Sequence, residues 1–185
     1  TGEAWSEIRY NPEIKNAYRH SSNPQPLHTD GSYIPSFPDA SIMYCVKNSD
    51  KGGETIFIDK EAFLEILEKD VPILKKQLME TEVVHERSGD KKISSIIEER
   101  NGDIFLHWNY YCVNKENSEI KEMIESLFDF LGNNKAIKNN LIEVHLKPGE
   151  CVIWKDSETL HGRNGFEAKN ASERYLYKSA FKVKK

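Results

Sequence analysis

His28 and Asp30, near the start of the chain, have side-chain types and a spacing that could bind one metal ion. On an extended segment, residues two positions apart project to the same side of the backbone, so both side chains can reach a common ion. The pair carries little information alone, because six histidines and 30 acidic residues among 185 positions give about one His-x-acid pair by chance. Its meaning depends on the residues that accompany it.

Two residues in the last third of the chain complete a pattern typical of non-haem iron chemistry. His161 follows a β-rich stretch, and Arg174 lies thirteen residues later, where the last strand-like run begins. Two imidazoles and one carboxylate on one face of an octahedral iron ion leave positions open for a co-substrate and O2. We therefore predict that His28, Asp30 and His161 are iron ligands. Arg174 is predicted to bind the far carboxylate of a chelating keto acid through its planar fork.

The elements expected to position these residues are mostly β-strands. Runs rich in β-branched and aromatic residues are separated by turn-forming sequences such as Asp50-Lys51-Gly52-Gly53 and Lys147-Pro148-Gly149-Glu150. Without regular βαβ alternation, this pattern favours a mainly β fold, a sandwich or barrel with helical insertions. The predicted strands are 41–46, 55–59, 82–86, 103–108, 142–146, 151–154 and Arg174–Val183, with a short extended piece around Leu27, and the predicted helices are 60–69, 72–80 and 119–131.

The helix predicted over 119–131 has the clearest periodicity, because its apolar residues recur at three- and four-residue intervals along one stripe. We assign this stripe to core packing and give it no functional role. Ser118 is the predicted N-cap and Gly132 the predicted end. For the two earlier helices, Asp59 and Asp70 are the predicted N-caps.

Composition excludes several classes of function. Lys and Arg number 26 and Asp and Glu 30, which gives a net charge of −4 with both signs interspersed, so neither nucleic acid nor an anionic membrane is an expected partner. The longest apolar runs, Ile42–Val46 and Cys151–Trp154, are far shorter than the ~18 residues of a membrane-spanning helix. Three widely spaced cysteines favour a reducing, cytoplasmic location over a disulfide framework.

Four blocks in order along residues 25–183 resemble the Fe(II)/2-oxoglutarate-dependent taurine dioxygenase and γ-butyrobetaine hydroxylase family. They are Pro26-Leu27-His28-Thr29-Asp30-Gly31-Ser32-Tyr33, Gly52-Gly53-Glu54-Thr55, Trp154-Lys155-Asp156 continuing to Leu160-His161-Gly162-Arg163, and Arg174. The resemblance implies a double-stranded β-helix (a jelly roll of the cupin-like kind) with iron in the barrel mouth. It also implies a single oxygenase domain over 1–185, and leaves open whether the upstream segment of longer members precedes it.

The resemblance assigns roles position by position. His28, Asp30 and His161 match the family's iron ligands, and Arg174 matches the arginine that binds 2-oxoglutarate. Thr55 matches a threonine whose hydroxyl also contacts 2-oxoglutarate, the alternative being an ordinary strand residue; the glycines before it are interpreted as a plain turn.

Three further residues are predicted to contact the substrate. Strand alternation places Lys178 on the same face as Arg174, where it could bind an acidic group of the substrate; the alternative is a solvated lysine. Tyr33 is chosen for its aromatic and polar character. Arg163 is chosen for its place next to the metal motif, and whether it contacts a ligand or braces the loop stays open.

The expected activity is that of a dioxygenase which uses Fe(II), 2-oxoglutarate and O2, releases succinate and CO2, and hydroxylates a C–H bond of a small amino-acid-like or carboxylate substrate. Asp30 disfavours a halogenase, whose metal site would carry a small residue there. Asp156-Ser157 departs from the family's frequent Asp-Asn. The rival interpretation is a non-catalytic metal-binding jelly-roll protein (a sensor, a structural protein or a truncated homologue); a metal-dependent hydrolase is a weaker third, since it gives Arg174 no role. A homo-oligomer stays open.

Overall fold

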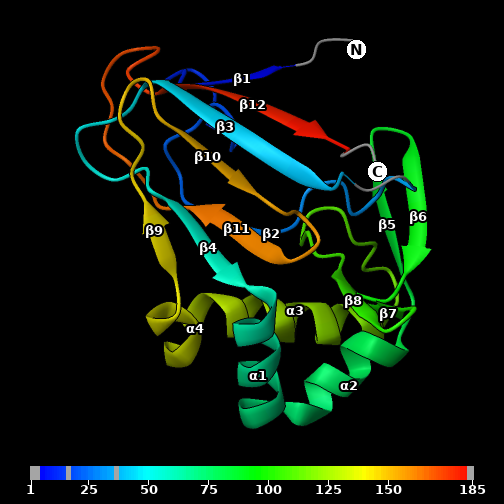
Figure 1. Cartoon of the computed structure of the whole chain (residues 1–185). Coiled ribbons are helices and arrows are strands. Elements are labelled where there is room, and N and C mark those ends of the chain that lie inside the picture. The colour runs from blue at the N-terminus through cyan, green and yellow to red at the C-terminus, as the bar shows by residue number, and fades with distance from the viewer. Residues whose placement is uncertain (1–4, 16–17, 36–37, 183–185) are drawn as a thin grey trace.

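Two four-stranded antiparallel sheets form the centre of the structure, a computed structural model that describes residues 5–15, 18–35 and 38–182. In Figure 1 they lie one above the other, with the helices below the lower sheet. The upper sheet has the order β1 (Ser6–Arg9), β12 (Tyr175–Phe181), β3 (Ala40–Lys47) and β10 (Cys151–Trp154). The lower sheet has the order β2 (Gln25–His28), β11 (Thr159–Arg163), β4 (Thr55–Asp59) and β9 (Ile142–Val144). The predicted mainly β jelly-roll class is confirmed.

Strand β4 divides the core into two layers by simple alternation. Ile56 and Ile58 face the large cluster that the helices build, whereas Phe57 faces the upper sheet, where it packs with Trp154 at 5.5 Å between ring centroids. Because side chains along a strand alternate between faces, one sheet can bury both surfaces. The interior between the sheets is therefore the place where inward-facing polar residues can meet.

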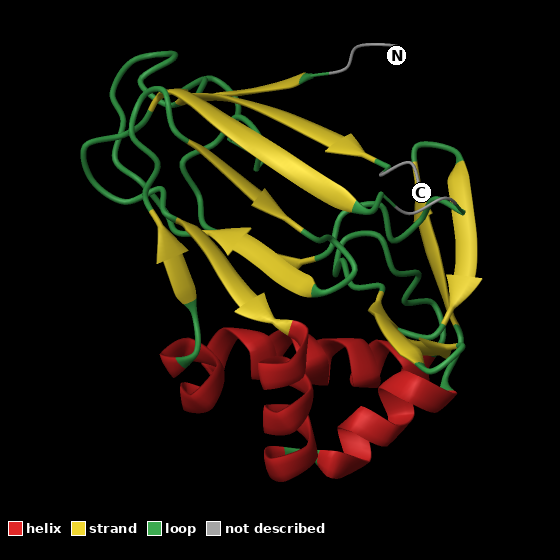
Figure 2. Ribbon diagram, viewed as in Figure 1, coloured by secondary structure: helices red, strands yellow, loops and turns green. Residues whose placement is uncertain are grey.

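Four helices cover the outer face of the lower sheet (Figure 2). They are α1 (Lys60–Asp70), α2 (Pro72–Glu80), α3 (Ser118–Asn133) and α4 (Lys135–Asn139). Two hairpins, β5 (Val83–Arg87) with β6 (Asp90–Ser94) and β7 (Ile97–Arg100) with β8 (Asp103–Leu106), stand at one end of the sheets. Among the described residues, no helix has the length and apolarity that crossing a bilayer requires.

Helix ends contain the main errors of the sequence-based predictions. Asp59 caps α1 as predicted, accepting hydrogen bonds from two backbone N–H groups. The N-cap of α3 is Asn117 and not Ser118, because the Asn117 side chain accepts the first free N–H groups of the helix. Asp70 ends α1 and does not cap α2, which starts at Pro72 after Val71. Gly132 lies inside α3, since the helix continues to Asn133.

Other boundaries agree with the sequence in part, and the strands predicted over 103–108 and 142–146 end two residues earlier, at Leu106 and Val144. The helix over 72–80 and the strand over 151–154 are confirmed at both ends. The last strand is described to Phe181, and its predicted end at Val183 lies outside the described residues. The elements that the sequence did not predict are β1, β6, β7, β11 and α4.

Candidate active site

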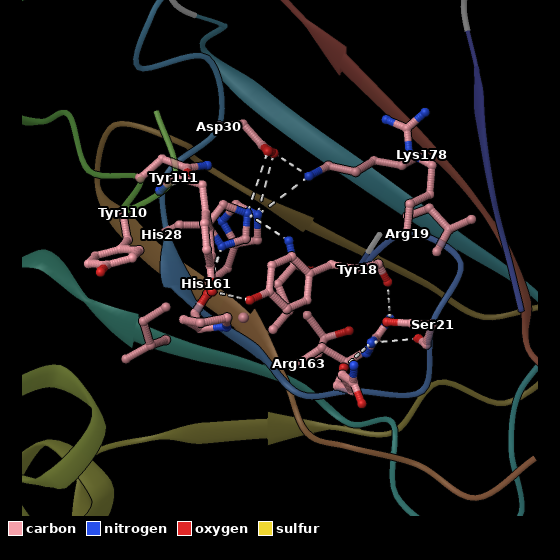
Figure 3. Close-up of a pocket in the computed structure, with 18 of the residues that line it drawn as sticks. Tyr18, Arg19, Ser21, His28, Asp30, Tyr110, Tyr111, His161, Arg163 and Lys178 are labelled. Carbon is pink, nitrogen blue, oxygen red and sulfur yellow. Dashed lines mark hydrogen bonds and ion pairs between the residues drawn. The ribbon is translucent and has the colours of Figure 1, made fainter. Parts of the chain in front are cut away.

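Three side chains that are distant in sequence converge between the two sheets. One ligand-type atom from each of His28, Asp30 and His161 lies within 4.8 Å of the other two. The His161 Nε2 atom is 3.4 Å from an Asp30 carboxylate oxygen, and the His28 Nε2 atom is 3.8 Å from the other oxygen. Both histidines are buried and Asp30 is half-buried, so the cluster opens toward the cavity on the aspartate side. Figure 3 shows the three groups pointing at one another.

The pairing of β2 with β11 brings the two imidazoles together. His28 and His161 are direct partners across this antiparallel ladder, and their ring centroids are 4.3 Å apart. Gly162 permits the close approach of the strands, because a Cβ atom there would lie 2.6 Å from the backbone oxygen of Gln25. The glycine of the His-Gly-Arg block is thus explained by packing rather than chemistry.

Trp108 fixes the backbone of the segment that carries His28 and Asp30. Its backbone N–H donates to the Thr29 hydroxyl at 2.9 Å, and the Thr29 N–H donates to its carbonyl at 2.6 Å. The indole N–H donates to the carbonyl of Leu27, also at 2.9 Å. Thr29 and Trp108 are almost completely buried. The sequence analysis gave Thr29 no role, because its contact partner lies 79 positions away.

The hydrogen bond at Nδ1 leaves the lone pair of His28 on Nε2, the atom that faces Asp30. The His28 Nδ1 atom lies 2.9 Å from the carbonyl of Pro26, an acceptor only, so Nδ1 carries the proton. Burial, followed by repulsion from His161, lowers the pKa of His28 to about 3 and keeps the imidazole neutral. A neutral imidazole with a fixed tautomer is the form that binds metal ions.

Lys178 reaches into the same cluster from β12. Its ammonium donates to an Asp30 carboxylate oxygen and lies 3.4 Å from His161 Nε2. Burial alone would raise the pKa of Asp30, but Lys178 and then His161 lower it well below its usual range. Strand alternation had predicted that Lys178 faces inward. A contact with the aspartate was not foreseen.

The donor set fits a divalent iron ion. Two imidazole nitrogens and one carboxylate oxygen on one side of a cluster are the ligands of the non-haem Fe(II) facial triad. The cluster attracts positive charge, since the Lys178 ammonium already contacts Asp30. His28, Asp30 and His161 are therefore suited to hold the metal, as their spacing in the sequence predicts.

Arg174 lies buried at the edge of the same cavity, just before β12. One of its terminal nitrogens donates to the carbonyl of Gly53 at 3.3 Å, and its Nε atom has no partner among the described residues. Gly53 has φ +81°, and a Cβ atom there would lie 3.1 Å from Arg174 Nε. The glycine therefore makes room for the guanidinium, a stronger requirement than the plain turn that the sequence suggested. Thr55 is also buried and lines the cavity.

The other predicted site residues are placed differently. Arg163 lines the cavity, but three of its five N–H groups donate to backbone carbonyls of residues 18, 21 and 23, so it braces that loop. Its Nε–H has no partner among the described residues. Tyr33 is half-buried and is not among the described residues that line the cavity. Neither placement tests whether these residues contact substrate.

Asp156 acts through another side chain instead of binding the metal. It is fully buried, and it accepts hydrogen bonds from the Ser41 hydroxyl and from the indole N–H of Trp154. The Trp154 ring packs against the His161 imidazole at 4.9 Å between centroids. Ser157, which stands where the family often has asparagine, therefore does not disturb the contacts by which Asp156 supports Trp154 and His161.

The cavity above the cluster has a volume of about 650 Å³, within the range of about 300–1,000 Å³ typical of small-molecule sites. Its walls include residues that the sequence analysis did not single out. The Gln25 side-chain amide donates to His28 Nε2 at 3.1 Å, and the hydroxyls of Tyr18 and Tyr111 form a hydrogen bond with each other. No local motif marks these residues, because their position depends on loops meeting in space.

Comparison with known proteins gives a family. A family model described as the taurine catabolism dioxygenase TauD, TfdA family matches residues 2–179. A curated relative, uridine-5'-phosphate dioxygenase of an Amycolatopsis species, is 24% identical over 96% of this chain and 68% of its own length. Trimethyllysine dioxygenase of Meyerozyma guilliermondii is 24% identical over 77% of this chain and 39% of its own length.

A solved structure agrees with the fold. An asparagine oxygenase in complex with Fe(II), hydroxyasparagine and succinate superposes with a TM-score of 0.78 at 16% identity. It covers 97% of this chain, whereas this chain covers 56% of that protein. The chain thus spans little more than half the length of this structural relative.

Proposed function

The chain belongs to the taurine catabolism dioxygenase TauD, TfdA family, and on that premise we propose that it is an Fe(II)- and 2-oxoglutarate-dependent dioxygenase. The proposed reaction consumes O2, converts 2-oxoglutarate to succinate and CO2, and hydroxylates a C–H bond of a small amino-acid-like or carboxylate substrate. The residues that carry this activity form a single oxygenase domain in the proposal. A cytoplasmic location and a homo-oligomeric state stay predictions.

The convergence of His28, Asp30 and His161 beside a buried arginine is the observation that carries the proposal. Ligand atoms within 4.8 Å of one another can share one ion, and Arg174 lines the same cavity. A hydrolase would need the metal ligands but not the arginine. A 2-oxoglutarate-dependent enzyme needs both, because the co-substrate has a second carboxylate to hold.

In this proposal the protein positions reactants and the iron, when bound, activates O2 and accepts the keto acid as a chelate. Arg174 binds the far carboxylate of 2-oxoglutarate with the N–H groups not used by Gly53. Thr55 donates its hydroxyl to the same carboxylate. Trp154 holds the His161 ring and shields it from water.

Lys178 is the proposed contact for an acidic group of the substrate. Its ammonium lies at the open side of the metal cluster, so a substrate anion bound there would lie close to the reacting centre. Bound iron would share the negative charge of Asp30, which would leave the Lys178 ammonium to pair with the substrate. Contacts from Arg163 and Tyr33 stay predictions.

Substrates named for the relatives guide the choice of test compounds. They include a nucleotide, a methylated amino acid and, for the solved structure, asparagine as its hydroxylated product. Uridine 5'-phosphate, asparagine, trimethyllysine and taurine are therefore the first panel.

Release of succinate from 2-oxoglutarate tests the proposal. The purified protein with Fe(II) in air is expected to form succinate slowly without substrate and faster, in step with hydroxylated product, when a panel compound is accepted. The Asp30→Asn variant is expected to lose both rates, because a carboxamide is a much weaker iron ligand. A protein that binds iron but forms no succinate with any compound would instead be the non-catalytic jelly-roll protein.

A further inference from the structure

The walls of the cavity carry far more positive than negative charge. Asp30 is the single carboxylate among the described residues that line it, so six cationic side chains exceed the anionic ones by five. The whole chain has the opposite balance, with a net charge of −4. The six cationic residues are Lys15, Arg19, Arg87, Arg163, Arg174 and Lys178.

The inner cations repel one another in the absence of an anion. Lys178 pairs with Asp30, whereas Arg163 and Arg174, among the described residues, donate to neutral backbone carbonyls and lie over the Phe166 ring. Burial lowers the pKa of Arg163 to about 10, and burial, followed by repulsion from Arg163, lowers the pKa of Arg174 to about 9. Bound iron and 2-oxoglutarate would add two positive and two negative charges, so they leave the excess of five unchanged.

The other three cations of the lining, which we call the rim, come from two parts of the chain. Lys15 and Arg19 precede β2, whereas Arg87 ends β5 and lies beside the Cys112 thiol. All three are exposed, and no ion pair joins any of them to a carboxylate in the parts of the chain that the structure describes. Exposed lysines elsewhere, such as Lys91 and Lys147, likewise form no ion pair among the described residues. What distinguishes Lys15, Arg19 and Arg87 is that all three line one cavity, where like charges raise the local concentration of an anionic ligand.

Resting on the proposed function, we propose that the substrate is a small organic phosphate monoester whose dianionic group is bound by Lys15, Arg19 and Arg87 at the rim. A phosphate group carries close to two negative charges near neutral pH and several acceptor oxygens, which three cationic side chains can share. Its carbon skeleton extends inward, past Tyr18 and Tyr111, toward the metal cluster. A substrate with a positively charged group is disfavoured, because Asp30, a proposed metal ligand, is the one carboxylate among the described residues of the wall.

Binding measured by calorimetry separates this proposal from the enzymatic one. Phosphoserine with serine, and a nucleoside 5'-monophosphate with its nucleoside, are titrated into the anaerobic holoprotein with Fe(II) and 2-oxoglutarate, and into the metal-free protein. In both forms at least one monophosphate is expected to bind about tenfold or more tightly than its parent, about 1.4 kcal/mol. This preference is expected to shrink as salt is added, because the rim is exposed.

Variants of the rim supply the decisive comparison. Lys15→Gln, Arg19→Gln and Arg87→Gln are each expected to weaken monophosphate binding severalfold and, when combined, to abolish the preference, with the 2-oxoglutarate affinity unchanged. Lys91→Gln, an exposed lysine outside the cavity, is the matched control and is expected to bind as the natural chain does. Because the single variants alter exposed side chains, each should fold, and circular dichroism checks this.

Two results would overturn the proposal: equal binding of every monophosphate and its parent, or a preference that survives in the triple variant. Both leave the dioxygenase activity standing if succinate is still formed. Conversely, a monophosphate preference without succinate release would remove the proposed function and keep the rim as a phosphate site.

Discussion

The imidazoles of His28 and His161 face each other across the β2–β11 ladder as register partners, with ring centroids 4.3 Å apart. Their separation is therefore set by strand pairing and not by either residue's local sequence. Because side chains alternate along a strand, a slip of one residue would turn one of them out of the site. The metal cluster therefore depends on the contacts that fix this register, among them the hydrogen bonds of Thr29, which follows His28, to Trp108.

Replacing Thr29 by valine is expected to weaken both folding and iron binding. The substitution keeps the side chain's shape but removes the acceptor for the buried Trp108 N–H, which costs about 1–3 kcal/mol in the free energy of unfolding. Loss of this contact loosens the segment between His28 and Asp30, and iron affinity is expected to fall about 10–100-fold, as for residues that orient metal ligands.

Urea unfolding and iron titration measure the two effects of Thr29→Val. Thr81→Val is the control, since no hydrogen bond of the Thr81 hydroxyl occurs among the described residues. Iron affinity unchanged in Thr29→Val would contradict the assigned role of Trp108 and Thr29.

Gly53→Ala is expected to lower 2-oxoglutarate affinity more than its backbone strain explains. A Cβ atom at this position would lie 3.1 Å from Arg174 Nε and 2.8 Å from the Ser49 hydroxyl, so the guanidinium must shift. Gly89→Ala is a matched control, because Gly89 also has a positive φ but nothing lies within 4 Å of its Cβ position.

Both alanine variants are expected to lose about 1–2 kcal/mol of folding stability from the left-handed backbone. Only Gly53→Ala is expected to raise the dissociation constant for 2-oxoglutarate, by about tenfold, as measured by anaerobic titration of the iron-loaded protein. Equal affinities in the two variants would show that Gly53 serves the turn alone.

Lys178→Ala is expected to raise KM for an acidic substrate while the 2-oxoglutarate affinity stays unchanged. The ammonium contacts Asp30 in the metal cluster, whereas Arg174, the cation proposed for the co-substrate, donates to the Gly53 carbonyl. Steady-state kinetics with each compound varied in turn measure the two effects. A loss of both affinities, or of neither, would argue against this division of roles.

Two buried histidines outside the site make the fold sensitive to acid. Burial, followed by repulsion from His107, lowers the pKa of His85 to about 4, and burial, followed by repulsion from Lys92, lowers that of His107 to about 4. The charged groups facing the pair are Lys92 on β6 and Glu98 and Arg100 on β7. Because these folded-state pKa values lie below the unfolded value of about 6.5, the unfolded chain binds more protons in acid.

Stability is therefore expected to be constant with respect to these groups above about pH 6.5 and to fall between about pH 6.5 and 4. Between pH 7.5 and pH 5 the free energy of unfolding is expected to fall by about 2 kcal/mol for each histidine. Urea unfolding at the two pH values measures it, and His85→Gln is expected to remove about half of the loss. If the free energy of unfolding falls by the same amount in the natural chain and in His85→Gln, His85 is excluded as a cause.

The sequence predicted the elements and residues whose signals are local. The helix over 72–80 starts at a proline, and the strand over 151–154 follows a Pro-Gly turn, so neighbouring residues in the sequence determine where both elements start. The His-x-Asp pair and His161 were recognisable for the same reason, as short motifs. The N-cap of α3 was misplaced by one residue because Asn117 and Ser118 are both good caps, and only the hydrogen bonds distinguish them.

Features that depend on distant contacts could not be predicted. Trp108 is bonded to Thr29 across 79 positions, and the braces of Arg163 reach back more than 100 positions to the loop before β2. The contact between Lys178 and Asp30 likewise depends on how the two sheets are stacked. Strand β6 was missed because its charged sequence lacks apolar alternation, and its pairing with β5 comes from the hairpin turn.

Anaerobic titration of the metal-free protein with Fe(II) and 2-oxoglutarate tests most directly whether the three ligands and Arg174 form one centre. One equivalent of each is expected to give a weak visible charge-transfer band that is absent with either alone. The band is expected to be lost in Asp30→Asn and to require much more 2-oxoglutarate in Arg174→Gln. A protein that gives no band with both components, or an equally strong band in Asp30→Asn, would contradict an iron centre built from His28, Asp30 and His161.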